Sequence, residues 1–378
     1  MSCRVLITGG AGFIGSWLAQ DLVASGVPVR LIDNLSPQIH GEMPKLGYPW
    51  LDSPFAEFRR GDVRDVDFLS EALRDCEVVV HLAAETGTGQ SMYQIAHYYE
   101  VNVQATATLL ECIAVRHNSI KKIILASSRS IYGEGAYEID GQITVPAPRS
   151  PEQLAAAQWD PVYSDGRRLR LIATPESVQP RPASIYATTK VAIEQLGAVF
   201  AEAYGKSVAA LRFQNVFGER QSLRNPYTGI LSIFSNKLRQ GLPISIFEDG
   251  KESRDFVHVK DVVNAIRTAV ERLPNGFHAI NIGSGQPTSV LEVAERLKSL
   301  LKGESEIRVS GEFRCGDIRH CYADLTRAHT LLGYAPSVSF NEGLERFVGW
   351  VKTQPLVSDL SGVAQAELVK RGLGSFAN

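Results

Sequence analysis

Hydrophobic positions divide the first 215 residues into short apolar runs and longer segments with helical spacing. Uniformly apolar or β-branched runs are typical of parallel strands that are covered on both faces. Such runs occur at 5–7, 29–32, 78–84, 122–128 and 207–213, and residues 58–62 close a further short strand. Apolar residues that recur every three or four positions predict helices at 16–25, 66–74, 98–117 and 186–204. Strands that alternate with helices predict an α/β fold built on a doubly wound parallel sheet.

This alternation changes at two places. Residues 133–181 contain several prolines and little periodicity, and loops of this length are usually functional or disordered. After residue 215, shorter segments predict a smaller α/β domain, with strands near 243–247 and 307–309 and helices near 255–272, 289–301 and 344–351. We therefore divide the chain into a sheet domain over 1–215 plus about 253–275, with an excursion over 133–181, a second domain over 216–252 and 276–352, and a tail over 353–378 that either docks or frays.

The composition excludes several classes of protein. The formal net charge is −2, so no basic excess indicates nucleic-acid binding. The five cysteines are scattered and odd in number, which is typical of reduced thiols in the cytoplasm and not of a metal cluster. No apolar stretch approaches the roughly 20 residues that cross a bilayer, and no apolar leader precedes the first strand. We expect a cytoplasmic protein that binds no membrane, nucleic acid or metal.

A glycine-rich turn, Thr8–Gly15, connects the first strand to the first helix. A strand, such a turn and a helix form the context of a dinucleotide fingerprint, in which a pyrophosphate rests on the helix N-terminus. The second strand ends at Asp33, where a carboxylate would accept from the adenosine ribose and repel a 2′-phosphate. Together they predict a Rossmann domain that binds NAD, with a ligand-free turn as the alternative. The candidate contacts in the turn are Gly9, Gly12, Phe13, Ile14 and Gly15.

Tyr186 and Lys190 lie four residues apart, which places a phenol and an ammonium on one face of a helix. A nearby ammonium favours the phenolate, so we expect the pKa of Tyr186 to fall from about 10 toward neutrality. Such a tyrosine can remove and return the proton of a sugar hydroxyl. Taken alone, a Tyr and a Lys at this spacing are more often an ordinary surface pair. The preceding dinucleotide fingerprint favours catalysis.

These motifs, in this order, resemble those of the extended short-chain dehydrogenase/reductases, and within them the NAD-dependent nucleotide-sugar epimerase/dehydratase group. The resemblance covers about residues 3–350. Its motifs are the glycine turn, Asp33, residues 61–63, residues 81–84, the Ser-Ser-x-x-Ile-Tyr-Gly run at 127–133, Tyr186–Lys190 and residues 254–259. The resemblance implies a homodimer paired through the helices at 98–117 and 186–204.

The resemblance also implies roles for individual residues. Ser128 takes the position of the catalytic hydroxyl beside Tyr186, and Lys190 that of the donor to the nicotinamide ribose. The further cofactor contacts implied are Asn34, Asp62, Val63, Leu82, Ala83, Ala84 and Asn102. The substrate contacts implied are Thr86, Ser128, Asn215, Arg254, Arg314 and Asp317.

Positions 129 and 130 discriminate within the family. The 4,6-dehydratases carry an Asp-Glu pair there, whereas this chain has Arg129 and Ser130, so the resemblance favours an epimerase. Thr86 stands where galactose epimerases often have a lysine, which argues against a hexose substrate. Blocks at 90–93, 225–229, 246–250 and 316–321 resemble the dTDP-L-rhamnose 4-epimerases.

The expected reaction is inversion of C4 in a nucleotide-diphosphate sugar, dTDP-L-rhamnose-like or a UDP-hexose, through a 4-keto intermediate. A C2-epimerase and a 4-keto reductase remain open as alternatives, as does a non-enzymatic protein that senses NAD. The excursion over 133–181 is expected to form a lid or rim near the substrate, because both its ends adjoin catalytic candidates. A solvated or subunit-facing loop is the alternative.

Overall fold

The computed structural model describes residues 4–42, 46–225, 227, 229–314, 316–357, 359, 361–371 and 373. Pro226 and Thr228 of the block at 225–229, together with Cys3 and Cys315, lie outside the described residues. Cys76, Cys112 and Cys321 are free and buried. Among the described residues, no helix is both long and apolar enough to span a membrane.

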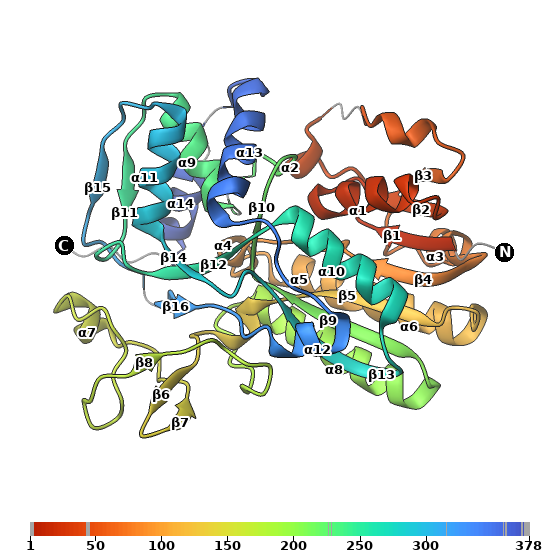
Figure 1. Ribbon diagram of the computed structural model, residues 1–378, viewed down its shortest axis with the longest axis horizontal. Helices are drawn as coiled ribbons and strands as arrows, with labels where there is room; N and C mark the ends of the chain where they lie inside the picture. Colours follow the sequence, from red (N-terminus) through yellow and green to blue (C-terminus); the bar gives the residue numbers. More distant parts are fainter. Residues whose placement is uncertain are drawn as a thin grey trace.

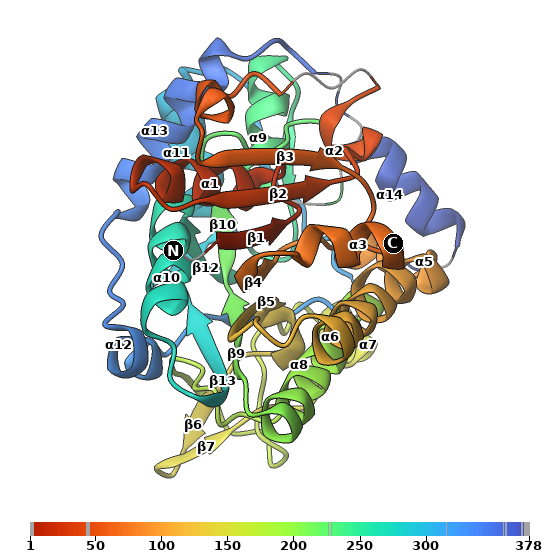
Figure 2. The same ribbon diagram turned by 90° about the vertical axis from the view of Figure 1, so that its right-hand side faces the viewer.

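A seven-stranded parallel sheet forms the larger layer, in the order β13-β9-β5-β4-β1-β2-β3 (Figures 1 and 2). The predicted doubly wound α/β fold is confirmed. Its strands are β1 (Arg4–Thr8), β2 (Val29–Asp33), β3 (Ala56–Arg60), β4 (Cys76–His81), β5 (Lys122–Ser128), β9 (Ser207–Phe213) and β13 (Gly276–Ile282).

Helices cover both faces of this sheet because successive strand residues point to opposite sides. In β1, Val5 and Ile7 join one buried cluster while Leu6 joins the other. The first cluster lies under α1 (Phe13–Ala24), α10 (Val259–Arg272) and α12 (Thr326–Leu332). The second lies under α3 (Val66–Leu73), α6 (Ala105–Arg116) and α8 (Ile185–Tyr204). The predicted helix over 98–117 consists of α5 (Ile95–Tyr99), a π-helical turn (Glu100–Gln104) and α6.

Short elements connect the ends of these strands and helices. They are α2 (Pro37–His40), α4 (Thr88–Ser91) and two 3₁₀ turns, Pro49–Asp52 and Arg129–Tyr132.

The smaller layer has its own core and its own sheets. A four-stranded sheet contains β10 (Asn215–Phe217), β12 (Ser253–His258), β14 (Pro287–Ser289) and β16 (His320–Cys321). A separate two-stranded sheet consists of β11 (Ile244–Ile246) and β15 (Ile307–Val309). The covering helices are α9 (Ile230–Arg239), α11 (Val290–Leu301) and α13 (Phe340–Thr353).

Two predicted boundaries are wrong. Residues 255–258 belong to strand β12 of the smaller sheet, so the helix predicted over 255–272 begins only at Val259. Residues 276–282, assigned to the second domain, form β13 and pair with β9 at the edge of the large sheet. The chain therefore crosses between the two layers more often than the sequence-based division allows.

The excursion over 133–181 is a structured insert at the lower left of Figure 1. It contains a three-stranded sheet of β6 (Tyr137–Ile139), β7 (Gln142–Thr144) and β8 (Arg170–Leu171), and the short helix α7 (Pro151–Ala155). Buried Arg149 holds it to the smaller layer through an ion pair with Glu248 at 2.8 Å. Arg149 also donates to the Asp317 carbonyl at 2.8 Å. The excursion therefore supports a segment that carries predicted substrate contacts.

The tail docks through α14 (Ser361–Lys370). A Cβ on Gly89 would lie 3.2 Å from the Leu368 side chain, and the Arg371 guanidinium lies 4.5 Å from the centre of the Tyr93 ring. The tail thus contacts the loop that follows β4.

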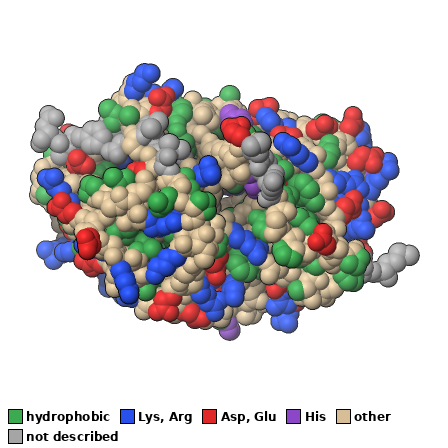
Figure 3. All heavy atoms as spheres, turned by 90° about the horizontal axis from the view of Figure 1, so that it is seen from above, with side chains coloured by type: hydrophobic (Ala, Val, Ile, Leu, Met, Phe, Trp, Pro, Cys, Tyr) green, Lys and Arg blue, Asp and Glu red, His purple; other side chains and the backbone are tan. Residues whose placement is uncertain are grey.

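Acidic and basic side chains lie side by side over the face of the molecule in Figure 3.

Candidate active site

The turn between β1 and α1 has contacts that only glycine allows. Gly9 has φ +65°, and a Cβ there would lie 2.8 Å from the backbone nitrogen of Ala83. A Cβ on Gly15 would lie 2.3 Å from the Gly9 carbonyl oxygen. The turn is therefore packed closely between the end of β4 and the first turn of α1.

The outer side of this turn can receive a phosphate. Gly12 is the N-cap of α1, and no side chain caps the helix there. The first turn, which begins with Phe13 and Ile14, contains no acidic residue. A Cβ on Gly12 would meet the Gly9 carbonyl oxygen at 3.1 Å and no other atom within 4 Å beyond its chain neighbours. Uncapped N–H groups beside an open glycine face suit a phosphate at a helix N-terminus.

Asp33 ends β2, and its carboxylate is held in one orientation. Oδ2 accepts from the backbone N–H of Ala11 at 3.1 Å, and Oδ1 accepts from that of Leu35 at 2.8 Å. His40 Nε2 lies 3.7 Å from Oδ1. The bond to Ala11 fixes the carboxylate beside the glycine turn, where a ribose hydroxyl could donate to it.

Asn34 and Asp62 come together beyond the ends of β2 and β3. Asn34 Nδ2 donates to Asp62 Oδ2 at 3.1 Å. Two hydrogen bonds from the Arg64 side chain hold the pKa of Asp62 well below its usual range. Val63, next to them, is buried. The Asp62 carboxylate is therefore ionised at neutral pH and accepts hydrogen bonds only.

Residues after β4 pack directly on the end of β1. The Leu82 N–H donates to the Thr8 carbonyl at 3.2 Å, and the Ala83 N–H donates to the Thr8 hydroxyl at 3.1 Å. Ala84 follows in the same segment. Three residues with small or apolar side chains thus line the edge of the glycine turn.

Asn102 acts on this segment from the π-helical turn. Its Oδ1 accepts from the Glu85 N–H at 2.8 Å. Its Nδ2 donates to the Glu85 carbonyl at 3.1 Å and to the Thr189 hydroxyl at 3.0 Å. Both amide hydrogens are used within the protein. Asn102 is therefore placed to position the loop against α8 rather than to donate to a cofactor.

Ser128, Tyr186 and Lys190 converge where β5 ends against α8. Ser128 is the last residue of β5, and its hydroxyl is hydrogen-bonded with the Tyr186 phenol. Lys190 lies one helical turn beyond Tyr186, and its Nζ is 5.6 Å from the centre of the tyrosine ring. The same Nζ donates to the Ala126 carbonyl at 2.8 Å. The three predicted catalytic side chains therefore share one site.

The predicted pKa of Tyr186 is wrong. Burial raises the pKa of the phenol above its usual value, and this outweighs the lowering by the Ser128 hydrogen bond and by the Arg129 charge. Burial also lowers the pKa of Lys190 to about 8. The four-residue spacing correctly predicts that the two side chains lie close together. It contains no information about desolvation, which has the largest effect on both pKa values.

Asn215 and Arg254, two of the predicted substrate contacts, lie in the smaller layer. Asn215 begins β10, which pairs with β12. Arg254 on β12 donates to the carbonyls of Ile318 and Arg319 at 2.8 and 3.0 Å. Arg254 and Asn215 both interact with Arg129, which follows Ser128 directly.

The remaining predicted substrate contacts have other partners. The Arg314 guanidinium lies 4.7 Å from the centre of the Phe247 ring, and Asp317 is exposed. The Thr86 carbonyl accepts from the buried Tyr98 hydroxyl at 2.7 Å. Thr86 thus lies in the loop after β4, whereas no described interaction joins Arg314 or Asp317 to the catalytic trio.

Sequence reasoning missed the polar groups that support this trio. The Ser91 hydroxyl oxygen accepts from the backbone N–H of Tyr186 at 3.0 Å. Glu194, four residues after Lys190, forms a buried ion pair with Arg212 at 2.8 Å. A charged residue among the apolar positions of α8 is a signal that could have found Glu194. Ser91 lies 95 residues from Tyr186, so no local pattern points to it.

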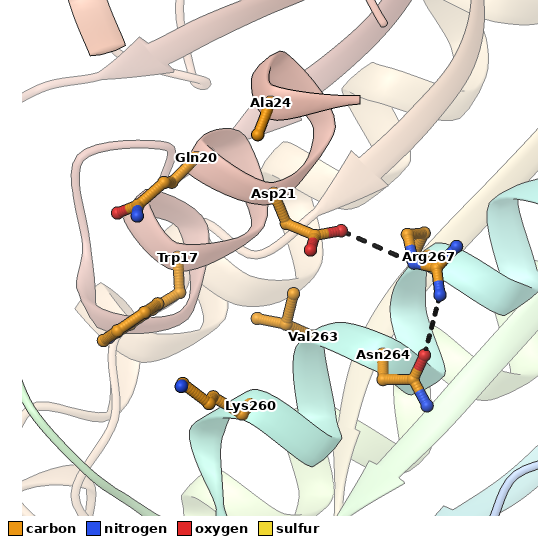
Figure 4. A pocket seen from close by; sticks show the side chains of 8 residues that line it. All are labelled: Trp17, Gln20, Asp21, Ala24, Lys260, Val263, Asn264 and Arg267. Atoms are coloured by element: carbon orange, nitrogen blue, oxygen red, sulfur yellow. Dashed lines mark hydrogen bonds and ion pairs between the residues drawn. The ribbon is translucent and has the colours of Figure 1, made fainter. Parts of the chain in front are cut away.

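A separate hollow of about 380 Å³ lies between α1 and α10 (Figure 4). Trp17 and Asp21 line it from α1, and Lys260 and Arg267 line it from α10. None of the predicted site residues lines this hollow.

Comparison with known proteins identifies the family. The model of the NAD dependent epimerase/dehydratase family matches residues 5–283. The chain belongs to this family. It is 39% identical over 351 residues to a dTDP-L-rhamnose 4-epimerase of Burkholderia thailandensis, which covers 92% of this chain and 94% of the relative.

Solved structures of family members agree with the fold. The UDP-glucose 4-epimerase of Thermotoga maritima, solved with UDP-glucose, has a TM-score of 0.73 and 29% identity, covering 92% of this chain and 98% of that one. The UDP-glucose 4-epimerase of Thermus thermophilus, solved with NAD, has a TM-score of 0.72 and 28% identity, covering 93% and 100%. The predicted family, Rossmann fold, NAD cofactor and epimerase class of enzyme are confirmed.

Proposed function

We propose that this family member is a 4-epimerase of nucleotide-diphosphate sugars, with a dTDP-L-rhamnose-like sugar or a UDP-hexose as substrate. The observation that carries the proposal is the convergence of Ser128, Tyr186 and Lys190 where β5 ends against α8. Positions 129 and 130 add an arginine and a serine, and so no acid–base pair for eliminating water. The 39% identity to a dTDP-L-rhamnose 4-epimerase supports the sugar class.

The chain's residues fit NAD. The uncapped start of α1 suits the pyrophosphate, the Asp33 carboxylate suits a ribose diol, and Asp62 suits the adenine amino group. When bound, NAD⁺ supplies the hydride acceptor, and its positive nicotinamide ring favours a tyrosinate nearby. Lys190, which the Ala126 carbonyl orients, would donate to the second ribose.

Tyr186 takes the role of acid and base. Its phenolate oxygen would remove the proton of the C4 hydroxyl while Ser128 donates to the sugar oxygen. After the 4-keto sugar presents its opposite face, the same phenol would return the proton and complete the inversion. Because the same proton and hydride are returned, the reaction needs no external acid, base or reductant.

The experiment that tests this function follows the sugar itself. The purified protein is incubated with UDP-, dTDP-, GDP- and CDP-sugars in deuterated water, and the products are resolved by NMR. A C4 epimer without deuterium at C4 is expected, because the hydride returns to the carbon that it left. Tyr186→Phe is the matched inactive control.

Other outcomes favour the alternatives. A product inverted at C2 in place of C4 would favour a C2-epimerase, and stoichiometric loss of added NAD(P)H would favour a 4-keto reductase. Binding of NAD with no conversion of any sugar would favour a protein that senses NAD. Absence of a 4-epimer across the whole panel would contradict the proposed function.

A further inference from the structure

Arg129 is a cation at the centre of the site without a carboxylate partner. It opens the 3₁₀ turn after Ser128, and its Nε donates to Asn215 Oδ1 at 2.7 Å. Within the described part of the chain, neither terminal nitrogen of its guanidinium has a hydrogen-bond acceptor and no carboxylate forms an ion pair with it. An arginine fork with both ends available is suited to a planar or tetrahedral oxyanion.

Glu134 is a carboxylate that contributes to the electrostatic surroundings of Arg129, and it is already engaged. Its oxygens accept from the backbone N–H groups of Arg319 and His320, both at 2.7 Å, and from the Tyr137 hydroxyl at 3.0 Å. The Arg129 charge is therefore not neutralised by the protein at close range.

A second guanidinium increases the positive charge. Arg254 is fixed by backbone carbonyls. Burial, with a smaller contribution from the charge of Arg254, lowers the pKa of Arg129 to about 10. Two partly buried cations that repel each other destabilise the folded protein unless an anion binds between them. The pair is thus arranged to gain stability from a negatively charged ligand.

Asn215 completes a set of donors. Because its Oδ1 accepts from Arg129, its Nδ2 is directed elsewhere, and Nδ2 has no acceptor among the described residues. The neighbouring polar atoms at this point of the site are therefore donors from two arginines and one amide. They lie next to Ser128 and Tyr186, which are the groups proposed to hold the reacting sugar.

We propose that Arg129 binds the phosphate that is joined directly to the sugar, and so makes the site specific for nucleoside diphosphates over monophosphates. The inference rests on the proposed function, since it assumes a nucleotide sugar in this site. Arg129 follows Ser128 directly and interacts electrostatically with both Tyr186 and Arg254, which favours the sugar-linked phosphate over the nucleoside-linked one. Its charge also lowers the pKa of Tyr186, so a bound phosphate would act on the base as well.

Binding measurements on the full chain test this inference without requiring turnover. Calorimetry compares UDP with UMP and dTDP with dTMP for the wild type, Arg129→Gln, Arg129→Lys and the control Arg168→Gln. Arg168 is exposed and lies in the excursion. For Arg129→Gln we expect diphosphate affinity to fall roughly 10- to 100-fold, the range for hydrogen bonds to a charged group, with monophosphate affinity nearly unchanged. Arg129→Lys should recover part of the loss, and Arg168→Gln should match the wild type.

The thermal unfolding midpoint separates binding from a merely structural role. Removing one of two repelling cations should leave the midpoint of Arg129→Gln equal to that of the wild type or above it. A lower midpoint with equal loss of mono- and diphosphate binding would overturn the proposal. So would an unchanged preference for the diphosphates in Arg129→Gln. If no sugar is epimerised while the diphosphate preference still depends on Arg129, the proposed function fails and this inference stands.

Discussion

Glu194 and Arg212 form a buried ion pair directly behind the catalytic side chains. Glu194 Oε1 accepts from Arg212 Nε at 3.0 Å and Oε2 accepts from Nη2 at 2.8 Å. Glu194 also accepts a short hydrogen bond from the hydroxyl of Ser127, the neighbour of Ser128. A further Arg212 nitrogen donates to the Tyr132 hydroxyl at 2.8 Å. The pair therefore joins α8, the end of β5 and β9 at the point where Ser128 and Lys190 must keep their geometry.

Replacing Arg212 by methionine should destabilise the protein strongly. The substitution leaves the Glu194 carboxylate buried and without its guanidinium, and breaking a buried pair in this way costs about 3–5 kcal/mol. Urea denaturation measures the loss. Arg167→Met is the control, because Arg167 pairs with Asp140 and Asp165 on the surface of the excursion. Similar unfolding midpoints for the two variants would show that the buried pair stabilises the protein no more than the surface pair does.

Ser128→Ala should shift the pH dependence of turnover to higher pH. The Ser128 hydrogen bond lowers the pKa of Tyr186 while burial raises it, so removing the hydroxyl leaves burial less opposed. Since the tyrosine acts as a base in the first step, activity should rise with pH, and this rise should begin at a higher pH in the variant. A pH series of kcat for both proteins measures the shift. A reduced kcat with an unshifted profile would mean that Ser128 positions the sugar without affecting Tyr186.

The large sheet was predictable because its signal is local. Each central strand is a short apolar run, and alternate residues fill opposite clusters, as Leu6 and Ile7 do. The glycine turn and the Tyr186–Lys190 pair are equally local, because the chemistry sets their spacing. These features therefore reveal both the fold and the cofactor.

What could not be predicted depends on pairing between distant residues. Phe256 and Val257 are apolar neighbours that suit a helix as well as a strand, and their pairing with β10 decides the outcome. Nothing near Gly276 indicates that this strand returns to the large sheet beside Ser207. The Arg149–Glu248 pair that fixes the excursion joins residues 99 positions apart. The pKa of Tyr186 likewise depends on burial by the whole site.

Glu252→Gln should stabilise the protein above pH 7. Glu252 is buried, and among the described residues its Oε2 has no hydrogen-bond donor and its nearest cation is Arg319 at 3.9 Å. Burial, with a smaller contribution from Glu248, raises the pKa of Glu252 from 4.5 to about 7. The folded protein therefore binds more protons than the unfolded chain between these values, so the free energy of unfolding falls as pH rises through this range.

Glutamine at this position does not titrate, so it removes this pH dependence. It should raise the free energy of unfolding by about 1–3 kcal/mol at pH 8 and by much less at pH 4.5. Urea denaturation of the wild type and of Glu252→Gln at both pH values measures this difference in the free energy of unfolding. Glu202→Gln, at an exposed position of α8, is the control and should follow the wild type. An equal effect of Glu252→Gln at both pH values would show that Glu252 does not titrate in this range.

We propose that two copies of the chain pair through α5, α6 and α8, which lie side by side in Figure 2. Val199 on α8 is 69% exposed and Val115 on α6 is 74% exposed, and Ile95, Tyr99 and Tyr204 add further apolar surface. In a two-fold dimer each substitution acts twice, so Val199→Glu should weaken association at least about tenfold by burying two unpaired carboxylates. Light scattering after size exclusion measures the mass. Val309→Glu on β15, in the smaller layer, is the matched control and should leave the mass unchanged. A monomeric wild type, or equal masses for all three proteins, would contradict pairing through these helices.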